Sequence, residues 1–202
     1  MKETLCFASN NAHKLDEVAS ILGDLFTIQT LTDIGCTDEL PETTGTIPGN
    51  SAQKARYVFD HFNIACFADD SGLEVAALNG EPGVDSAFYA GGNKPGETRS
   101  HEKNMAKLLK NMAGQTNRRA RFRTVITLVE PDSTGAPVEH QFEGIVSGTV
   151  LAEKRGTGGF GYDPVFLPDG YTQTFAEMSM AQKSQISHRA RALAGLVSYL
   201  TD

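Results

Sequence analysis

The 202-residue sequence has no run of about 20 apolar residues, the length that a membrane-spanning helix needs. Its first residues, MKETLCFASNN, lack a basic start followed by an apolar stretch, so we expect no signal peptide. It has only three cysteines, Cys6, Cys36 and Cys66, and no CxxC pair. Free cysteines are commonly buried, so we expect inert core thiols. These features favour a protein of the reducing cytoplasm with no membrane partner.

The sequence also lacks an excess of positive charge. Its 18 Lys and Arg residues against 25 Asp and Glu residues give a net charge of −7. Affinity for a phosphate backbone needs a basic surface, so we expect no nucleic-acid partner, although a local basic pocket for one small anion stays compatible. The P-loop, the HExxH motif and the GxS-type nucleophile elbow are absent, so nothing supports a Walker NTPase, a zinc protease or a serine hydrolase.

What is present is an ordinary globular composition, long enough to fold without a disulfide or a metal. The apolar patterns predict strands at Thr4–Ala8, Phe26–Leu31, Ile64–Ala68, Leu73–Leu78, Arg119–Glu130 and Val138–Val150, and a short one ending Gly156–Pro168. They predict helices from Asn11 to about Gly23, at Ser51–Phe62, at His101–Met112 and at Gln185–Leu200, with irregular stretches at Thr37–Asn50 and Asn79–Lys94. This order predicts one α/β domain over residues 1–202, with a central mixed twisted sheet flanked by helices.

The first candidate site segment is Ser9-Asn10-Asn11-Ala12-His13-Lys14. It forms a polar turn between a buried strand and a helix. A helix N-terminus offers free backbone N–H groups and a positive dipole end, which suit phosphate. An Asn-capped helix with a solvated lysine is the alternative.

The second candidate is Asp69-Asp70-Ser71-Gly72, directly after the expected strand Ile64–Ala68. Adjacent side chains on an extended backbone point in opposite directions, so Asp69 and Asp70 should play different parts. Their oxygens suit Mg²⁺, which takes one or two carboxylates together with phosphate and water. An acidic turn that caps the next element is the alternative.

The third candidate joins Glu42 to Asn50 and Lys54. The last two are four residues apart and share a helix face if the helix begins near Pro48. A carboxylate, an amide and an ammonium suit a metal–triphosphate complex, whereas a solvated loop with a helix cap is the plainer interpretation.

Two later segments carry aromatic and basic groups. In Gly158–Pro164, Phe160 and Tyr162 could stack on a base, and Asp163 could accept from a base N–H or a ribose hydroxyl. A tight turn with aromatic packing is the alternative. Farther on stand Lys183 and Ser187-His188-Arg189. Ser187 or Ser184 could cap the last helix, and an arginine in a first helical turn hints at an anionic or carbonyl-bearing partner. An exposed basic helix start is the alternative.

Together these segments resemble the Ham1/inosine triphosphatase-like family of non-canonical purine NTP pyrophosphatases, essentially end to end. The matching stretches are Ser9-Asn10-Asn11…Lys14…Glu17, Glu42-Thr43…Asn50…Lys54-Ala55, Ala68–Val75, Leu78–Val84, Gly158–Phe166, Thr174–Glu177 and Ser187-His188-Arg189. DDSGLEV and GGFGYDPVF are the most specific of them.

The resemblance implies two lobes with the nucleotide in the cleft between them, a homodimer, and Mg²⁺-dependent hydrolysis of ITP, dITP, XTP or dXTP to a monophosphate and pyrophosphate. It implies that Ser9, Asn10, Asn11, Ala12, His13 and Lys14 hold the triphosphate, with Lys54 and Ser71 also on the phosphate side. It implies that Glu42 and Asp70 hold Mg²⁺, and that Asp70, supported by Asp69, is the general base toward water. It implies that Phe160, Gly161, Tyr162 and Asp163 position the nucleoside, and that Lys183, His188 and Arg189 read the purine 6-oxo edge.

Two segments depart from the family. Ser86-Ala87-Phe88-Tyr89 has Phe88 where the family has an arginine, and Ile47-Pro48-Gly49 replaces a phenylalanine followed by acidic residues. Two other functions stay open: a Maf-type pyrophosphatase for modified pyrimidine nucleotides, and a nucleotide- or RNA-binding regulator without turnover. The GGFGYDP and Ser187-His188-Arg189 segments favour the purine family. The Asp69-Asp70 pair speaks against binding alone, because two carboxylates repel a triphosphate unless a metal intervenes.

Overall fold

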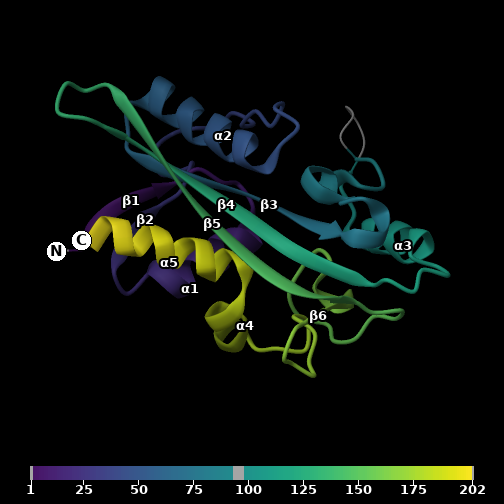
Figure 1. Cartoon of the computed structure of the whole chain (residues 1–202). Helices are drawn as coiled ribbons and strands as arrows, with labels where there is room; N and C mark the ends of the chain where they lie inside the picture. Colours follow the sequence, from purple (N-terminus) through teal and green to yellow (C-terminus); the bar gives the residue numbers. More distant parts are fainter. Residues whose placement is uncertain (1, 93–97, 202) are drawn as a thin grey trace. The chain divides into compact units, whose positions relative to one another are not determined.

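The computed structural model describes residues 2–92 and 98–201. Its strands form one six-stranded sheet in the order β2-β1-β3-β4-β5-β6 (Figure 1). The strands are β1 Glu3–Phe7, β2 Phe26–Gln29, β3 Cys66–Val75, β4 Arg119–Pro131, β5 Pro137–Val150 and β6 Phe166–Pro168. The helices are α1 Ala12–Leu22, α2 Ile47–Phe62, α3 His101–Asn111, α4 Met180–Ile186 and α5 His188–Thr201. β1 is parallel to β2 and β3, whereas β5 and β6 are antiparallel, so the predicted mixed α/β sheet is confirmed.

The described chain divides into two compact units. The first unit consists of residues 2–70, 124–144 and 189–201, and the second of residues 71–92, 98–123 and 145–188. Strands β3, β4 and β5 each contribute residues to both units. Among the described residues, no helix combines the length and the apolar character needed to cross a bilayer.

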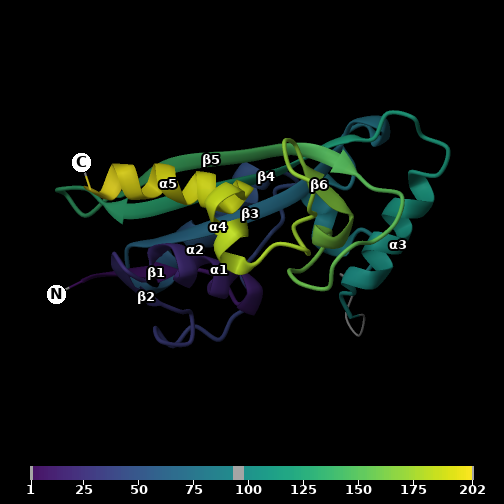
Figure 2. The same cartoon turned by 90° about the horizontal axis from the view of Figure 1, so that it is seen from below.

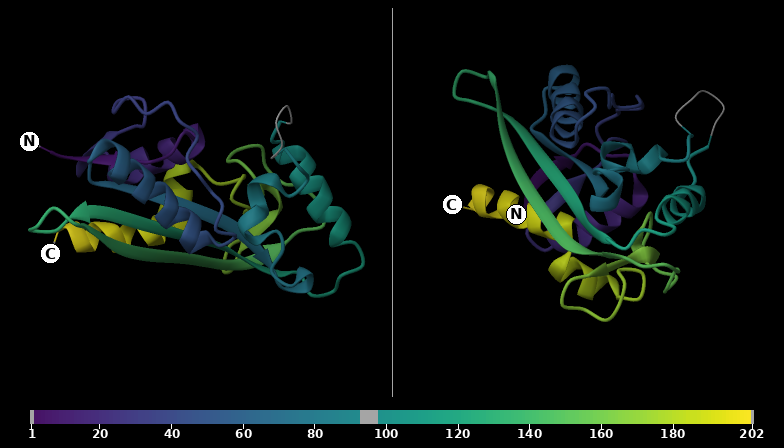
Figure 3. Two further views of the ribbon diagram at one scale, coloured as in Figure 1. Left: turned by 90° about the horizontal axis from the view of Figure 1, so that it is seen from above. Right: turned by 45° about the vertical axis from the view of Figure 1, so that its right-hand side comes forward.

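In the first unit, strand residues alternate between two apolar layers. Leu5, Phe7 and Phe67 join the layer of α1 and α5. Cys6 and Cys66 join the opposite layer, that of α2. Figure 1 and Figure 3 show α2 on the other side of these strands from α1 and α5, and Figure 2 shows α5 running along β5. The expectation of buried thiols is confirmed: Cys6, Cys36 and Cys66 are all buried and free, and burial raises the pKa of Cys6 to about 11.

The helix that carries the third candidate segment begins earlier than its composition predicts. α2 begins at Ile47, not at Ser51, because the Thr46 hydroxyl accepts from the backbone N–H of Gly49 and caps the helix. Pro48 fits the first turn, where its missing N–H has no partner to lose. The departure at residues 47–49 therefore builds a complete helix start.

The prediction of two separate strands, Ile64–Ala68 and Leu73–Leu78, was wrong. β3 is one continuous strand from Cys66 to Val75, and the two aspartates lie within it. A buried strand tolerates two carboxylates when each has a hydrogen-bonding or ionic partner, and the partners here come from three helices, α1, α2 and α5. Both outer ends also differ from the expectation: β3 begins at Cys66 rather than at Ile64, and residues 76–78 form a 3₁₀ turn.

The last predicted helix is two helices. α4 ends at Ile186, Ser187 has an extended conformation, and α5 starts at His188. The prediction that His188 and Arg189 lie in the first turn of the last helix is confirmed. Ser184 lies within α4, so it does not cap that last helix.

The second unit has its own apolar core. Met105 and Leu108 of α3, and Met112 at its C-cap, face this core, and Leu109 is partly buried, as the amphipathic pattern predicts. The expected irregular stretch Asn79–Lys94 contains a 3₁₀ turn, Gly83–Phe88, and its residues 93 and 94 lie outside the described residues.

Candidate active site

Asp69 and Asp70 point to opposite layers of the first unit. Phe67 lies in the α1/α5 layer and Ala68 in the α2 layer, so alternation along β3 sends Asp69 toward α1 and α5 and Asp70 toward α2. The hydrogen bonds agree, since Asp69 bonds to Lys14 and Arg189, and Asp70 bonds to Asn50. The prediction that the two carboxylates have different surroundings is confirmed.

Asp69 is the centre of a closed ion-pair network. Its Oδ1 accepts from Lys14 Nζ at 2.9 Å, and its Oδ2 accepts from Arg189 Nε at 3.0 Å and Nη2 at 2.9 Å. Arg189 also donates to Glu17, and both Asp69 and Arg189 are 1% exposed. Burial alone would raise the pKa of Asp69, but Lys14 and Arg189 outweigh it and hold that pKa well below its usual range. Asp69 is therefore ionised and structurally fixed.

Asp70 has a different electrostatic environment. It is 7% exposed, and its Oδ2 accepts from Asn50 Nδ2 at 3.3 Å. Burial raises the pKa of Asp70 to about 6; Lys54 and Lys14 offset part of that rise, and Glu42 adds to it. A carboxylate with such a pKa exchanges protons near neutral pH, which is what a general base needs.

Glu42 completes the charged group around Asp70. Lys54 donates a hydrogen bond to Glu42, and burial of Lys54 lowers its pKa less than Asp70 and Glu42 raise it. Lys54 therefore stays a cation between two carboxylates. We call Glu42 and Asp70 the carboxylate pair.

The carboxylate pair fits a magnesium ion. Each carboxylate raises the electrostatic cost of the other, as the effect of Glu42 on the pKa of Asp70 shows. Within the described chain, no group of three or more histidine, cysteine, aspartate or glutamate side chains is arranged to hold a metal. Magnesium takes one or two carboxylates and completes its shell with water and phosphate oxygens, so a pair is a suitable donor set.

The raised pKa of Asp70 predicts that the parent and an Asp70→Asn variant differ in stability when EDTA removes divalent cations. Because its folded pKa of about 6 exceeds its ordinary value of 3.8, Asp70 favours folding below pH 3.8 and loses that contribution as the pH rises through 6. Asp70→Asn removes the cost of ionisation. Urea denaturation should therefore find the variant more stable by about 3 kcal/mol at pH 7.5, and by roughly half of that at pH 5. A difference that is constant between these pH values would contradict the raised pKa.

The predicted phosphate-binding turn lies at the N-terminus of α1, in the first unit. The Asn11 side chain caps the helix by accepting from the backbone N–H of Lys14 at 3.2 Å. Asn10, Ala12 and His13 are exposed, and Lys14 reaches Asp69 from the first helical turn. The helix is thus capped by Asn11, and Lys14 is bonded to Asp69 rather than solvated. Ser71, the next residue of β3 after Asp70, is half-buried and belongs to the second unit.

In the second unit, Asp163 braces the glycine-rich turn. It is buried, and its Oδ2 accepts from the backbone N–H of Phe160 at 2.9 Å and from Lys183 Nζ at 2.6 Å. The Lys183 ammonium lies 5.0 Å from the centre of the Phe160 ring. Phe160, Asp163 and Lys183, which come from two distant segments, are therefore brought together.

Tyr162 and His188, also predicted to contact the nucleoside, are more buried than Phe160. Tyr162 packs in the core of the second unit, and its hydroxyl donates to the carbonyl of Ser86 at 2.8 Å. The His188 ring is buried and stacks on Phe122 at 4.6 Å. Phe160 and Gly161 are only partly buried. Of the two aromatic residues expected to stack on a base, Phe160 is thus the more accessible.

Phe88 stands where the resemblance leads one to expect an arginine, and another arginine, Arg99, lies beside it. Arg99 stacks on the Phe88 ring, with its Cζ 4.5 Å from the ring centre. The sequence departure at Phe88 therefore does not remove positive charge from that part of the second unit.

Sequence reasoning did not assign a role to two residues that hold the site together. Glu17 was noted only as part of a motif, although it is a buried acid on the apolar side of α1 that bonds to Arg189. Gln53 bonds to Thr43, beside Glu42. An acid within an apolar helix pattern is a signal that could have found Glu17; no local signal marks Gln53.

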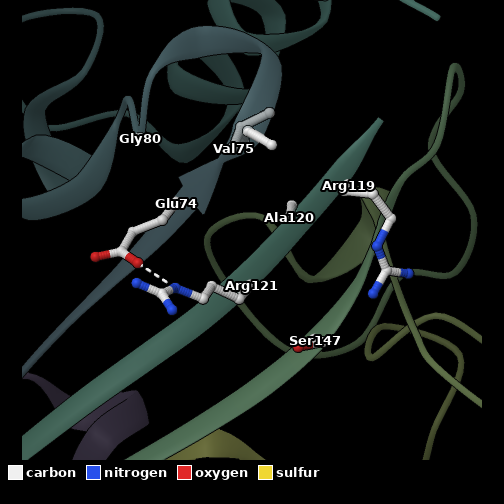
Figure 4. Close-up of a pocket in the computed structure, with 8 residues that line it drawn as sticks. Glu74, Val75, Gly80, Arg119, Ala120, Arg121 and Ser147 are labelled. Atoms are coloured by element: carbon white, nitrogen blue, oxygen red, sulfur yellow. Dashed lines mark hydrogen bonds and ion pairs between the residues drawn. The ribbon is translucent and has the colours of Figure 1, made fainter. Parts of the chain in front are cut away.

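A separate pocket of about 360 Å³ lies in the second unit (Figure 4). It is lined by Glu74, Val75, Ala76, Gly80, Arg119, Ala120, Arg121 and Ser147. Its two arginines are already paired: Arg121 with Glu74 at 2.5 Å, and Arg119 with Asp169 at 2.7 Å. No predicted site residue lines this pocket, so the carboxylate pair is the stronger candidate for chemistry.

Comparisons with known proteins agree with one another. The sequence matches the Ham1 family over residues 5–199. It is 47% identical over 195 residues to a protein of Flavobacterium psychrophilum named dITP/XTP pyrophosphatase, covering 96% of this chain and 97% of that one. A protein of Porphyromonas gingivalis with the same name is 47% identical over 199 residues, covering 98% and 97%. The solved structure of the Staphylococcus aureus Ham1 protein is 38% identical, with a TM-score of 0.85 and 98% of each chain covered.

Proposed function

The chain belongs to the Ham1 family, and we propose that, like its relatives named dITP/XTP pyrophosphatase, it hydrolyses non-canonical purine nucleoside triphosphates. The substrates are dITP, ITP, XTP and dXTP, and the products are the nucleoside monophosphate and pyrophosphate. The observation that carries the proposal is the carboxylate pair, in which buried Asp70 has a pKa near neutrality and lies close to Glu42 and Lys54. This arrangement suits attack by water on a phosphoanhydride.

We propose that Glu42 and Asp70 hold Mg²⁺. When bound, Mg²⁺ neutralises charge on the triphosphate oxygens and keeps a neighbouring carboxylate ionised. Asp70 orients the attacking water and accepts its proton. Asn50 fixes the Asp70 carboxylate by donating to Oδ2, and Lys54 supplies a further positive charge for the phosphates.

The triphosphate is assigned to the N-terminus of α1. Asn10, Ala12 and His13 are exposed, and the segment from Asn10 to His13 lies at the positive end of the helix dipole, a place that suits phosphate. Lys14 adds an ammonium whose position is fixed by Asp69 at 2.9 Å. Asp69 supports the chemistry through Lys14, because an ionised aspartate on the opposite side of β3 from Asp70 is not placed to take a proton from the same water. Ser71 remains a proposed phosphate contact.

The base is assigned to the second unit. Phe160 offers a partly buried aromatic face for stacking, and Lys183 offers a donor for the 6-oxo group of inosine or xanthine. ATP carries a 6-amino group, which donates where the site also donates, and its binding would leave buried polar groups unpaired. Gly161, Tyr162 and His188 stay proposed nucleoside contacts, and Asp163 acts by bracing the turn. Arg189 lies in the first unit with its guanidinium paired to Asp69 and Glu17, so we propose that it acts there rather than on the base.

We also propose that the protein forms a homodimer and is located in the cytoplasm. Light scattering on the purified protein measures the first, and fractionation of cells measures the second.

The experiment that tests the function is pyrophosphate release from ITP, dITP, XTP, GTP and ATP, with modified pyrimidine triphosphates assayed alongside. We expect rapid release from the first three and slow release from GTP and ATP. Turnover of modified pyrimidine triphosphates alone would identify a Maf-type enzyme instead. Tight nucleotide binding with no release from any triphosphate would identify a regulator.

Two neighbouring glycines provide a matched test of the base-binding turn. Gly159 and Gly161 both have positive φ, +67° and +63°, so a side chain strains either one. A Cβ at Gly159 would lie 2.1 Å from Asp163 Oδ2, whereas a Cβ at Gly161 meets nothing within 4 Å. Gly159→Ala should therefore lower kcat/KM for ITP by about 10-fold or more relative to Gly161→Ala, because it displaces the carboxylate that braces Phe160 and Lys183. A Gly159→Ala variant that keeps the parent's kcat/KM in steady-state kinetics would show that the Asp163 brace is not needed.

A further inference from the structure

The loop of residues 37–46, which carries Glu42, is fastened to α2 by a pair of hydrogen bonds from Gln53. Gln53 Oε1 accepts from the backbone N–H of Thr43 at 2.8 Å. Gln53 Nε2 donates to Thr43 Oγ1, also at 2.8 Å. A single amide thus uses both its acceptor and its donor on the residue that follows Glu42, and we call this pair of bonds the Gln53 clasp.

The Gln53 clasp belongs to a row of contacts between α2 and the loop. Lys54 donates to Glu42, and the Asn50 Oδ1 accepts from the backbone N–H of Thr44 at 3.1 Å and from its hydroxyl at 2.9 Å. Residues 50, 53 and 54 are three and four apart, so they share one face of the helix. Three consecutive loop residues are thereby bonded to three residues of one helix face.

The two residues that flank the clasp on this helix face, Asn50 and Lys54, also interact with Asp70. Asn50 also bonds to Asp70, and Lys54 also interacts with Asp70, so substrate and metal would engage both of them. Gln53 touches neither carboxylate of the pair in any hydrogen bond described. One of its two bonds is to the backbone N–H of Thr43 and the other is to the Thr43 hydroxyl, so both act on the residue beside Glu42.

We propose that Gln53 is a positioning residue for the divalent cation: through Thr43 it holds Glu42 where Glu42 and Asp70 bind the ion together. The inference rests on the proposed function for the identity of the ion. A loop that is fixed before binding loses less conformational entropy when the cation arrives. Without the clasp, Glu42 stays paired to Lys54 but on a looser loop, and the cation binds more weakly.

Three variants of the full chain separate this role from a general effect on folding. Gln53→Ala removes both bonds. Gln53→Glu retains both, because its carboxylate accepts from the Thr43 backbone N–H and from the Thr43 hydroxyl. Asp60→Ala is the matched control, since Asp60 is an exposed residue on the same helix with no hydrogen bond to the loop among those described.

Two measurements are made on each variant. The first is the Mg²⁺ concentration that gives half-maximal hydrolysis of ITP. The second, which needs no turnover, is the dissociation constant of Mn²⁺ followed by electron paramagnetic resonance. For Gln53→Ala we expect both to rise by roughly 3- to 10-fold, the effect of losing one or two exposed hydrogen bonds. At saturating Mg²⁺ its kcat should stay within about two-fold of the parent value, because the reacting groups are unchanged.

Asp60→Ala should match the parent in both measurements, and Gln53→Glu, which keeps both bonds and adds a negative charge beside the site, should bind Mn²⁺ at least as tightly as the parent. Mn²⁺ binding by Gln53→Ala that equals the parent value would overturn the clasp, and so would a loss of kcat that saturating Mg²⁺ does not restore. If the parent binds Mn²⁺ but hydrolyses no purine triphosphate, the proposed function fails, while the Mn²⁺ constants still decide the role of Gln53.

Discussion

Asp70→Asn lowers kcat for ITP by about 10²- to 10⁴-fold, the usual contribution of a positioned general base. The asparagine keeps the shape of the side chain and can still accept from Asn50, so the network around it survives. It cannot take a proton from water, and it has lost one of the two negative charges of the carboxylate pair. Steady-state release of pyrophosphate, at several Mg²⁺ concentrations, measures the loss.

Asp60→Asn is the control for this change, because it makes the same substitution at an exposed position on α2. Circular dichroism and urea denaturation verify that both variants are folded. An Asp70→Asn variant that turns over at the parent rate would remove Asp70 from the mechanism, whatever its effect on stability.

Arg189→Met produces the second large effect, on stability. Its guanidinium is 1% exposed and is bonded to Asp69 and Glu17, which are also buried. Methionine fills much of the volume but leaves two buried carboxylates without their shared cation. Breaking a buried ion pair by removing one partner typically costs about 3–5 kcal/mol, so urea denaturation should show a loss of that size.

The control for Arg189→Met is Arg191→Met on the same helix, where the side chain is exposed. Its effect should stay within about 0.5 kcal/mol, as for most surface substitutions. If Arg189→Met is as stable as the parent and only selectivity between ITP and ATP changes, then Arg189 acts on the base, as the resemblance implies, rather than on Asp69.

The network around Asp69 shows what sequence reasoning can and cannot predict. Alternation along an extended strand was enough to predict that Asp69 and Asp70 face different surroundings, because that rule needs only neighbouring residues. Their partners were not predictable in this way. Lys14 is 55 residues from Asp69, and Arg189 is 120 residues from it. Only the packing of α1 and α5 on one side of β3 brings these charges together.

The same reason explains the errors in the fold. The pair of aspartates in DDSG looked like the end of a strand, because local rules count unpaired carboxylates as unfavourable in a buried strand. Long-range partners remove that penalty and β3 continues to Val75. The start of α2 was misplaced because Pro48 and Gly49 look like loop residues until the Thr46 cap is recognised. By contrast, the long hairpin of β4 and β5 and the apolar face of α3 depend on local periodicity and were predicted closely.

The central claim is that the carboxylate pair and Mg²⁺ cleave a non-canonical purine triphosphate between its α- and β-phosphates. The most direct test is to identify the products of ITP and XTP by chromatography, in Mg²⁺ and in EDTA. We predict monophosphate and pyrophosphate in equal amounts in Mg²⁺, and unchanged triphosphate in EDTA. Diphosphate with inorganic phosphate, or equal hydrolysis in EDTA, would contradict the account.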